Sequence, residues 1–174
     1  GLSRCFLPEE GCGEGSVIEG MEIVGVSSVG QLAGLLESPA DIPFFEAAPA
    51  AGDQEAYPVD YQELNGQEVL KRAAEVAAAG MHGLLISGRA GTGKTMAAKR
   101  LPTILPGLTR EEDIAISKVY SVCGLLPPGR PLLSRRPFRS PHHTITPHGL
   151  IGGGSVPRPR ELSLASGGVL FLDE

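Results

Sequence analysis

The stretch GRAGTGKT, residues 88–95, decides the fold. It matches the pattern G-x-x-x-x-G-K-[ST] at every constrained position, after a predicted strand over residues 84–87 and before a segment of good helix formers. Gly88, Gly91 and Gly93 let the backbone bend, so that amide N–H groups can approach oxygen atoms closely. The stretch therefore predicts a phosphate-binding loop in an α/β domain with a parallel sheet.

The side chains of this loop indicate that its ligand is ATP with Mg²⁺. Lys94 is expected to bridge the β- and γ-phosphates, and the Thr95 hydroxyl is expected to bind the metal. The residues predicted to bind nucleotide are Gly88, Gly91, Thr92, Gly93, Lys94 and Thr95.

The stretch GGVLFLDE, residues 167–174, predicts the second half of the same site. Its apolar residues 169–172 fit a parallel strand buried on both faces, which points the next two carboxylates at the edge where the phosphate loop lies. Asp173 is expected to hold Mg²⁺ through water, and Glu174 to orient and deprotonate the attacking water. With Lys94, Glu174 is a predicted catalytic residue of a Mg²⁺-dependent ATPase.

The domain organisation follows from where these motifs lie. The chain starts on Gly1 and stops inside its expected site, so we expect a piece of a longer protein, because domain boundaries normally fall in polar linkers. Residues 1–38 are predicted to be the end of a domain begun upstream. Residues 39–58, rich in Pro, Ala and acids, are predicted to be a linker, and residues 59–174 the N-terminal part of an ATPase domain.

Local signals predict several regular elements. They are a strand over 22–26, a helix capped by Ser27 or Ser28, a helix over 67–79 ended by Gly80, and a helix begun by the capping box of Thr109 and Glu112, with Gly124 beyond its end.

Charge is distributed unevenly along the chain. Residues 1–64 carry 12 acids and one base, whereas residues 114–160 carry seven bases and no acid. The bases are Lys118, Arg130, Arg135, Arg136, Arg139, Arg158 and Arg160. Either these cations are solvated or nucleotide-binding, or they form a surface for a polyanion. Arg158 and Arg160, beside three glycines at 152–154, are candidates for a mobile loop that contacts DNA phosphates. The arginines of RRPFR, residues 135–139, are alternatively directed at a neighbouring subunit.

The composition excludes several classes of protein. With 41% hydrophobic and 20% charged residues, the chain is typical of a soluble globular protein, and it lacks an apolar run of the roughly 18 residues that a membrane helix needs. Three scattered cysteines favour reduced thiols in the cytoplasm. His142, His143 and His148 with Cys123 lack the spacing of a metal-binding module.

Several motifs in order resemble the YifB/ComM competence-protein family of magnesium-chelatase-like AAA+ ATPases. They are NGQEVLKRAAEVAAAGMHGLLISG, GTGKTMAAKRLPTILPGL, RPFRSPHHT and GLIGGGSVPRPRELSLASGGVLFLDE. The resemblance implies a AAA+ module cut after its second nucleotide motif and preceded by the C-terminal tail of a Lon-protease-like (S5-like) α+β domain. It also implies a cytoplasmic ring, expected to be a hexamer, that hydrolyses ATP and moves DNA during recombination and branch migration in natural transformation, without a membrane partner.

This sequence departs from the family at two places. Arg160 stands where the family commonly has glycine, which leaves the turn of that loop open, and the phosphate loop begins Gly-Arg-Ala where Gly-Pro-Pro is usual. The family's sensor residue, arginine finger and helical lid would follow Glu174. A magnesium chelatase motor subunit and a non-catalytic nucleotide-binding regulator therefore remain as alternatives.

Overall fold

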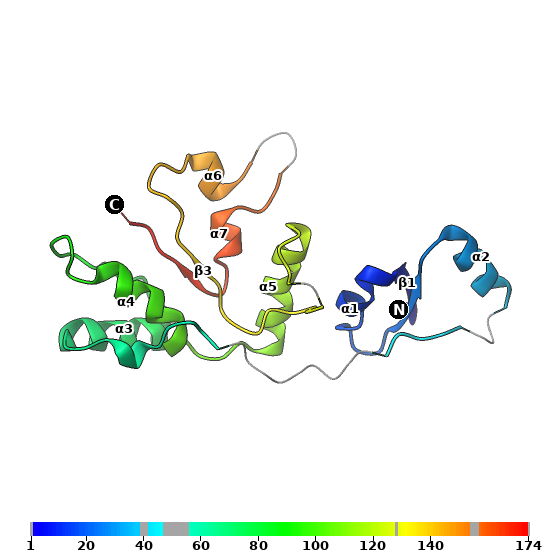
Figure 1. The fold of residues 1–174 in the computed structure, drawn as a ribbon, viewed down its shortest axis with the longest axis horizontal. Helices are drawn as coiled ribbons and strands as arrows, with labels where there is room; N and C mark the ends of the chain where they lie inside the picture. Colours follow the sequence, from blue (N-terminus) through cyan, green and yellow to red (C-terminus); the bar gives the residue numbers. More distant parts are fainter. Residues whose placement is uncertain (1, 39–41, 47–55, 128, 154–156, 174) are drawn as a thin grey trace. The chain divides into compact units, whose positions relative to one another are not determined.

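The structure is a computed structural model that describes residues 2–38, 42–46, 56–127, 129–153 and 157–173. The chain separates into two compact units, one of residues 1–53 with 126–133 and one of residues 54–125 with 134–174. Figure 1 labels their α-helices and the strands β1 and β3.

The first unit is built on two parallel strands. β1 (Arg4–Pro8) pairs in parallel with β2 (Glu22–Val26). The chain between them forms η1 (Glu9–Gly11) and α1 (Cys12–Gly15), and it is long enough for a parallel crossover connection. Val24 and Cys12 are almost fully buried and form its centre.

A capped helix follows this small sheet. α2 (Val29–Glu37) starts at Ser28, whose hydroxyl accepts a hydrogen bond from the Gln31 amide at 3.2 Å. The predicted strand over 22–26 and the cap at Ser28 are therefore confirmed.

Part of the predicted linker packs on this unit. Ile42 is buried, the Phe45 amide donates to the Ile23 carbonyl at 2.8 Å, and the Arg4 guanidinium lies 4.9 Å from the Phe44 ring centroid. Residues 42–46 thus belong to the first unit and are not a free connection, because an apolar side chain and a backbone hydrogen bond hold them there. Residues 47–55 of the predicted linker lie outside the described residues.

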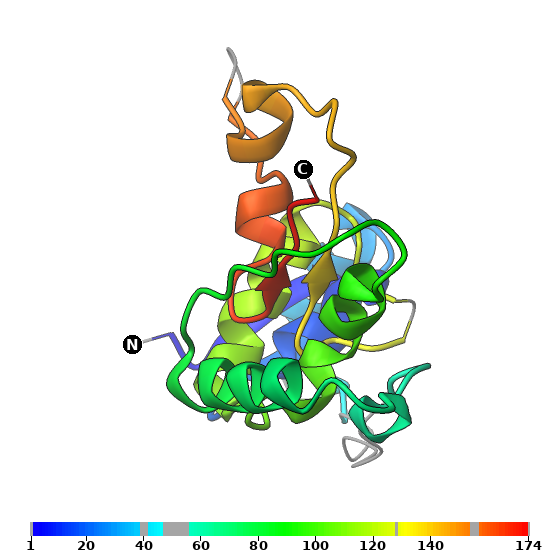
Figure 2. The same ribbon diagram turned by 90° about the vertical axis from the view of Figure 1, so that its left-hand side faces the viewer.

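The second unit contains a second parallel pair, β3 (Phe138–Arg139) with β4 (Val169–Leu170). Figure 2 shows the two arrows side by side. The Val169 amide donates to Pro137 and the Phe171 amide to Arg139, each at 2.8 Å. Gly168 is required at the start of β4, because a Cβ there would overlap the Pro137 carbonyl oxygen. The expected strand over 169–172 is shorter than predicted, and Leu172 is exposed.

Helices surround this pair. They are η3 (Tyr61–Glu63), α3 (Glu68–Gly80), α4 (Lys94–Arg100), η4 (Leu101–Ile104), α5 (Arg110–Val122), α6 (Pro147–Ile151) and α7 (Glu161–Leu164). Alanines of α3 and α4 and Ile116 of α5 are buried, together with Leu164 of α7. The predicted capping box is confirmed, since the Thr109 hydroxyl accepts from the Glu112 amide at 3.2 Å and the Glu112 carboxylate accepts from the Thr109 amide at 2.9 Å.

The C-terminus of α3 differs from the prediction. Gly80 is the last helical residue, and the left-handed residue that ends the helix is Met81, with φ 52°. The Met81 amide bonds to the carbonyls of Ala77 and Ala78, so the turn closes one residue later than a glycine stop would place it.

The predicted buried strand over 84–87 is wrong. The segment has no regular secondary structure, it has no strand partner within the described part of the chain, and Leu85 is 93% exposed. An extended segment becomes a strand only when a neighbour satisfies its backbone groups, so its apolar composition alone could not decide the matter.

Candidate nucleotide-binding site

The loop of residues 88–95 has the backbone shape that its glycines predicted. Gly91 and Gly93 have φ values of 78° and 85°, in the left-handed region that other residues rarely adopt. Gly93 is the N-cap of α4, and its carbonyl accepts the Ala97 amide at 2.9 Å. The loop therefore passes directly into the helix that carries Lys94 and Thr95.

Lys94 folds back onto its own loop. Its Nζ donates to the carbonyl oxygens of Gly88 at 2.8 Å and Arg89 at 3.1 Å. Thr92 closes the same turn, because its hydroxyl donates to the Arg89 carbonyl at 2.9 Å. Phosphate oxygens are charged and hence stronger acceptors than these carbonyls, so the ammonium is positioned to exchange one set of partners for the other.

The structure brings together the two residues expected to bind metal. The Thr95 hydroxyl donates to Asp173 Oδ2 at 3.4 Å, although 78 positions separate the two residues in sequence. Thr95 is in the first turn of α4, and Asp173 follows β4, so two different elements supply one pair of oxygen atoms. Oxygen ligands of this kind suit Mg²⁺, which typically takes one or two protein groups and completes its shell with water and phosphate. Glu174, the expected base, lies outside the described residues.

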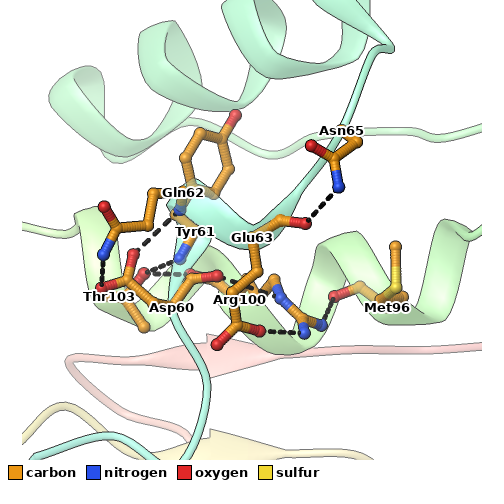
Figure 3. Close-up of polar contacts among 8 residues, drawn as sticks. All are labelled: Asp60, Tyr61, Gln62, Glu63, Asn65, Met96, Arg100 and Thr103. Carbon is orange, nitrogen blue, oxygen red and sulfur yellow. Dashed lines mark hydrogen bonds and ion pairs between the residues drawn. The ribbon is translucent and has the colours of Figure 1, made fainter.

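A polar cluster fixes the other end of α4. The Arg100 guanidinium donates to the Asp60 carbonyl at 3.0 Å and forms an ion pair with Glu63, while the Tyr61 amide donates to the Thr103 hydroxyl at 3.2 Å (Figure 3). Sequence reasoning missed Arg100, because nothing within a few residues of it shows that the preceding segment returns to contact it.

Arg136 is a structural residue, and its predicted polyanion or subunit contact is wrong. Its side chain is 5% exposed. Its guanidinium donates to the carbonyls of Pro106 and Gly167 at 2.6 Å, to that of Gly107 at 3.2 Å, and to Glu112 at 3.0 Å. Hydrogen bonds from the Thr109 backbone and from Arg136 lower the pKa of Glu112.

Arg139 is likewise held inside the second unit. Its guanidinium donates to both carboxylate oxygens of Glu161, at 2.7 and 2.6 Å, which links β3 to α7 and lowers the pKa of Glu161. Arg135 lies 5.7 Å from the Tyr57 ring centroid and donates to the Ala56 carbonyl at 3.4 Å. The strand expected at RPFR is present, but its arginines serve internal contacts.

The candidate DNA-contacting residues, unlike the buried or half-buried arginines of residues 135–139, are on the surface. Arg158 and Arg160 are exposed on the segment that precedes α7. Gly152 packs against this segment, since a Cβ there would lie 2.8 Å from the Arg158 carbonyl oxygen. Gly154 lies outside the described residues.

The His142 and His143 rings lie 4.1 Å apart, but no group of three or more His, Cys, Asp or Glu able to hold a metal occurs among the described residues. Within the same residues, every helix is too short or too polar to cross a membrane.

Comparisons with known proteins extend over the whole site. Residues 60–174 match the family model "Magnesium chelatase, subunit ChlI". Protein Rv2897c of Mycobacterium tuberculosis is 39% identical over 100% of this chain and 34% of its own length. YifB of Escherichia coli is 45% identical over 66% of this chain and 22% of its own length. Competence protein ComM of Haemophilus influenzae is 46% identical over 67% of this chain and 23% of its own length.

These matches bear on family membership more than on the activity of a whole protein. The chain spans about a third of the mycobacterial relative and less than a quarter of the other two. The family model nevertheless covers the phosphate loop, the strand that leads to Asp173 and everything between them. This chain therefore belongs to the magnesium-chelatase ChlI-like family, in the group that contains YifB and ComM.

Proposed function

We propose that this chain carries the ATP- and Mg²⁺-binding part of a AAA+ ATPase. The observation that carries the proposal is the 3.4 Å contact between Thr95 and Asp173 beside a glycine-rich phosphate loop. A chance glycine-rich turn would not place a hydroxyl and a distant carboxylate together next to a lysine. Membership of the ChlI-like family supports the same reading.

Each residue has a distinct part in the proposed reaction. The loop amides and Lys94 would hold the phosphates, and Thr95 and Asp173 would hold Mg²⁺, which would supply positive charge against the transferred phosphoryl group. Glu174 orients and deprotonates the attacking water. The Lys94 ammonium group already lies against the carbonyls of the loop, so its side chain can reach the γ-phosphate without rearrangement of the backbone.

Two substitutions in the complete protein test the proposal. Lys94→Ala is expected to abolish ATP turnover, whereas Lys99→Ala, which removes an exposed lysine from the same helix, is expected to leave it unchanged. Glu174→Gln is expected to retain ATP binding and to lose turnover, because the amide keeps the shape and loses the basic oxygen. Normal hydrolysis by Lys94→Ala would exclude the phosphate loop from the active site.

We further propose that the complete protein acts on DNA as an oligomeric ring, with Arg158 and Arg160 contacting phosphates. The support is that both side chains are exposed and that a relative, ComM of Haemophilus influenzae, is a competence protein. Replacing both by alanine in the complete protein should lower the salt slope of DNA binding by about one unit for each lost phosphate contact, with basal ATPase intact. An unchanged slope would remove this loop from the DNA surface.

A magnesium chelatase motor is the second candidate, because the family model bears that name. Stimulation of the ATPase by DNA is expected for the competence-type function and not for a chelatase motor. We also propose that residues 1–38 are the C-terminal tail of a Lon-protease-like domain. The match of the mycobacterial relative across residues 1–59 supports continuity of the two units in one protein.

A further inference from the structure

Gln67 has an uncommon backbone conformation for its residue type. Its φ and ψ are 57° and 42°, and among the described residues only Met81 shares a positive φ without being glycine. Gln67 is the N-cap of α3, yet its side chain does not cap that helix. Residues held in such conformations persist where the surrounding structure requires them, and they are frequent at functional sites.

The side chain of Gln67 reaches the phosphate loop. Its Nε2 donates to the Thr92 carbonyl at 2.8 Å, across 25 positions of sequence. Thr92 lies between the two left-handed glycines of the loop, and its own hydroxyl bonds inside the loop to the Arg89 carbonyl. The Thr92 carbonyl is thus a point where the loop is tied to the segment before α3.

The same segment also holds the far end of the helix that follows the loop. We call residues 60–67 the clasp. Its Asp60 and Glu63 bind Arg100 at the end of α4, and the Tyr61 amide binds Thr103 in η4 (Figure 3). The clasp therefore contacts the loop before α4 and the residues after it, so that a shift of the clasp would tilt the loop.

We propose that Gln67 is a positioning residue for the phosphate loop, which it holds through the Thr92 carbonyl so that the loop amides converge on the ligand's phosphate groups. This inference rests on the proposed ATP function. Gln67 acts on the phosphate loop and not on the adenine base of the nucleotide. Its removal should therefore lower the affinity for every ligand with the same polyphosphate chain by the same factor.

The test uses two variants of the complete protein, Gln67→Asn and Gln67→Gly. Both residues accept the left-handed backbone, and neither reaches Thr92. We expect both variants to have an unchanged or higher Tm and to bind ATP three- to tenfold more weakly, a change of about one net hydrogen bond. Their KM for ATP should rise while kcat is retained. Gln62→Ala is the matched control, since its amide bonds to Asp60 in the clasp and not to the loop.

Competition against a fluorescent ATP analogue provides the decisive comparison. ATP and inorganic tripolyphosphate should lose affinity by the same factor in both variants. Unchanged affinity in both variants would overturn the inference. A loss of affinity confined to ATP would also overturn it, because that result would place Gln67 against the adenine base. A fall in Tm that parallels the loss of affinity would overturn it too, because that result would assign Gln67 to the stability of helix α3. Absence of ATP binding by the unmutated protein and by Lys94→Ala alike would overturn the proposed function as well.

Discussion

Replacing Arg136 by alanine should destabilise the second unit more than any other single loss of charge described above. The guanidinium is 5% exposed and supplies hydrogen bonds to three backbone carbonyls and to Glu112. Each carbonyl left unsatisfied costs about 1–3 kcal/mol. The sum overestimates the effect, because water enters the space and the contacts are not additive. We therefore expect about 3–5 kcal/mol, toward the lower end of the summed cost of three unsatisfied carbonyls.

Arg135→Ala is the control in the neighbouring position. Its cation–π contact with Tyr57 and its 3.4 Å hydrogen bond to Ala56 predict a loss of at most about 1 kcal/mol. Arg136→Lys should be intermediate, because one ammonium group cannot span carbonyls on both sides of the guanidinium.

The measurements are urea unfolding of the complete protein and hydrogen exchange of two backbone amides that follow Gly167 in sequence. The Val169 amide donates to the carbonyl of Pro137, just before β3, and the Phe171 amide donates to that of Arg139 in β3. Protection of these amides should fall together with the free energy of unfolding. A loss under about 1 kcal/mol, equal to that of Arg135→Ala, would refute the reasoning.

Three further predictions follow from single contacts. Arg139 lowers the pKa of Glu161 below its ordinary 4.5, so the ion pair stabilises the fold above pH 4.5 and this contribution is lost as the pH falls through the folded-state pKa. Glu161→Gln should therefore flatten the acid side of a curve of Tm against pH, measured from about pH 6 to about pH 3. An unaltered acid side would contradict this prediction. Thr109→Ala should cost about 1 kcal/mol of unfolding free energy, with Thr109→Ser as the control that keeps the cap. Met81→Gly should raise stability by about 1 kcal/mol, because glycine accepts the left-handed turn; a lower Tm would show that the Met81 side chain matters more than its backbone.

Signals that act within a few residues could be predicted from the sequence. The cap at Ser28 and the box of Thr109 and Glu112 each depend on a side chain that reaches a backbone amide three positions away, and both are present. The phosphate loop has the same character, since the glycines at 91 and 93 specify its left-handed turns directly.

Features that depend on distant partners could not be predicted in the same way. The basic run gave no indication that Arg136 would be buried, because its acceptors lie 24 to 31 positions away. Gln67 gave no local sign of its bond to Thr92. The segment over 84–87 has the composition of a strand, but a strand is defined by its neighbours, and composition does not supply them.

The parallel pairing of β3 with β4 has a mechanical consequence. The chain leaves the end of β3 at Arg139, passes through residues 140–168 with the exposed Arg158 and Arg160, and re-enters at the start of β4. A force on this crossover pulls the two strands from opposite ends, so their hydrogen bonds are sheared together and are not opened one after another. The ion pair of Arg139 with Glu161 carries part of that force into β3 before it reaches the turn ahead of β4. Traction on the loop is thus shared between β3 and β4, the strand that leads to Asp173.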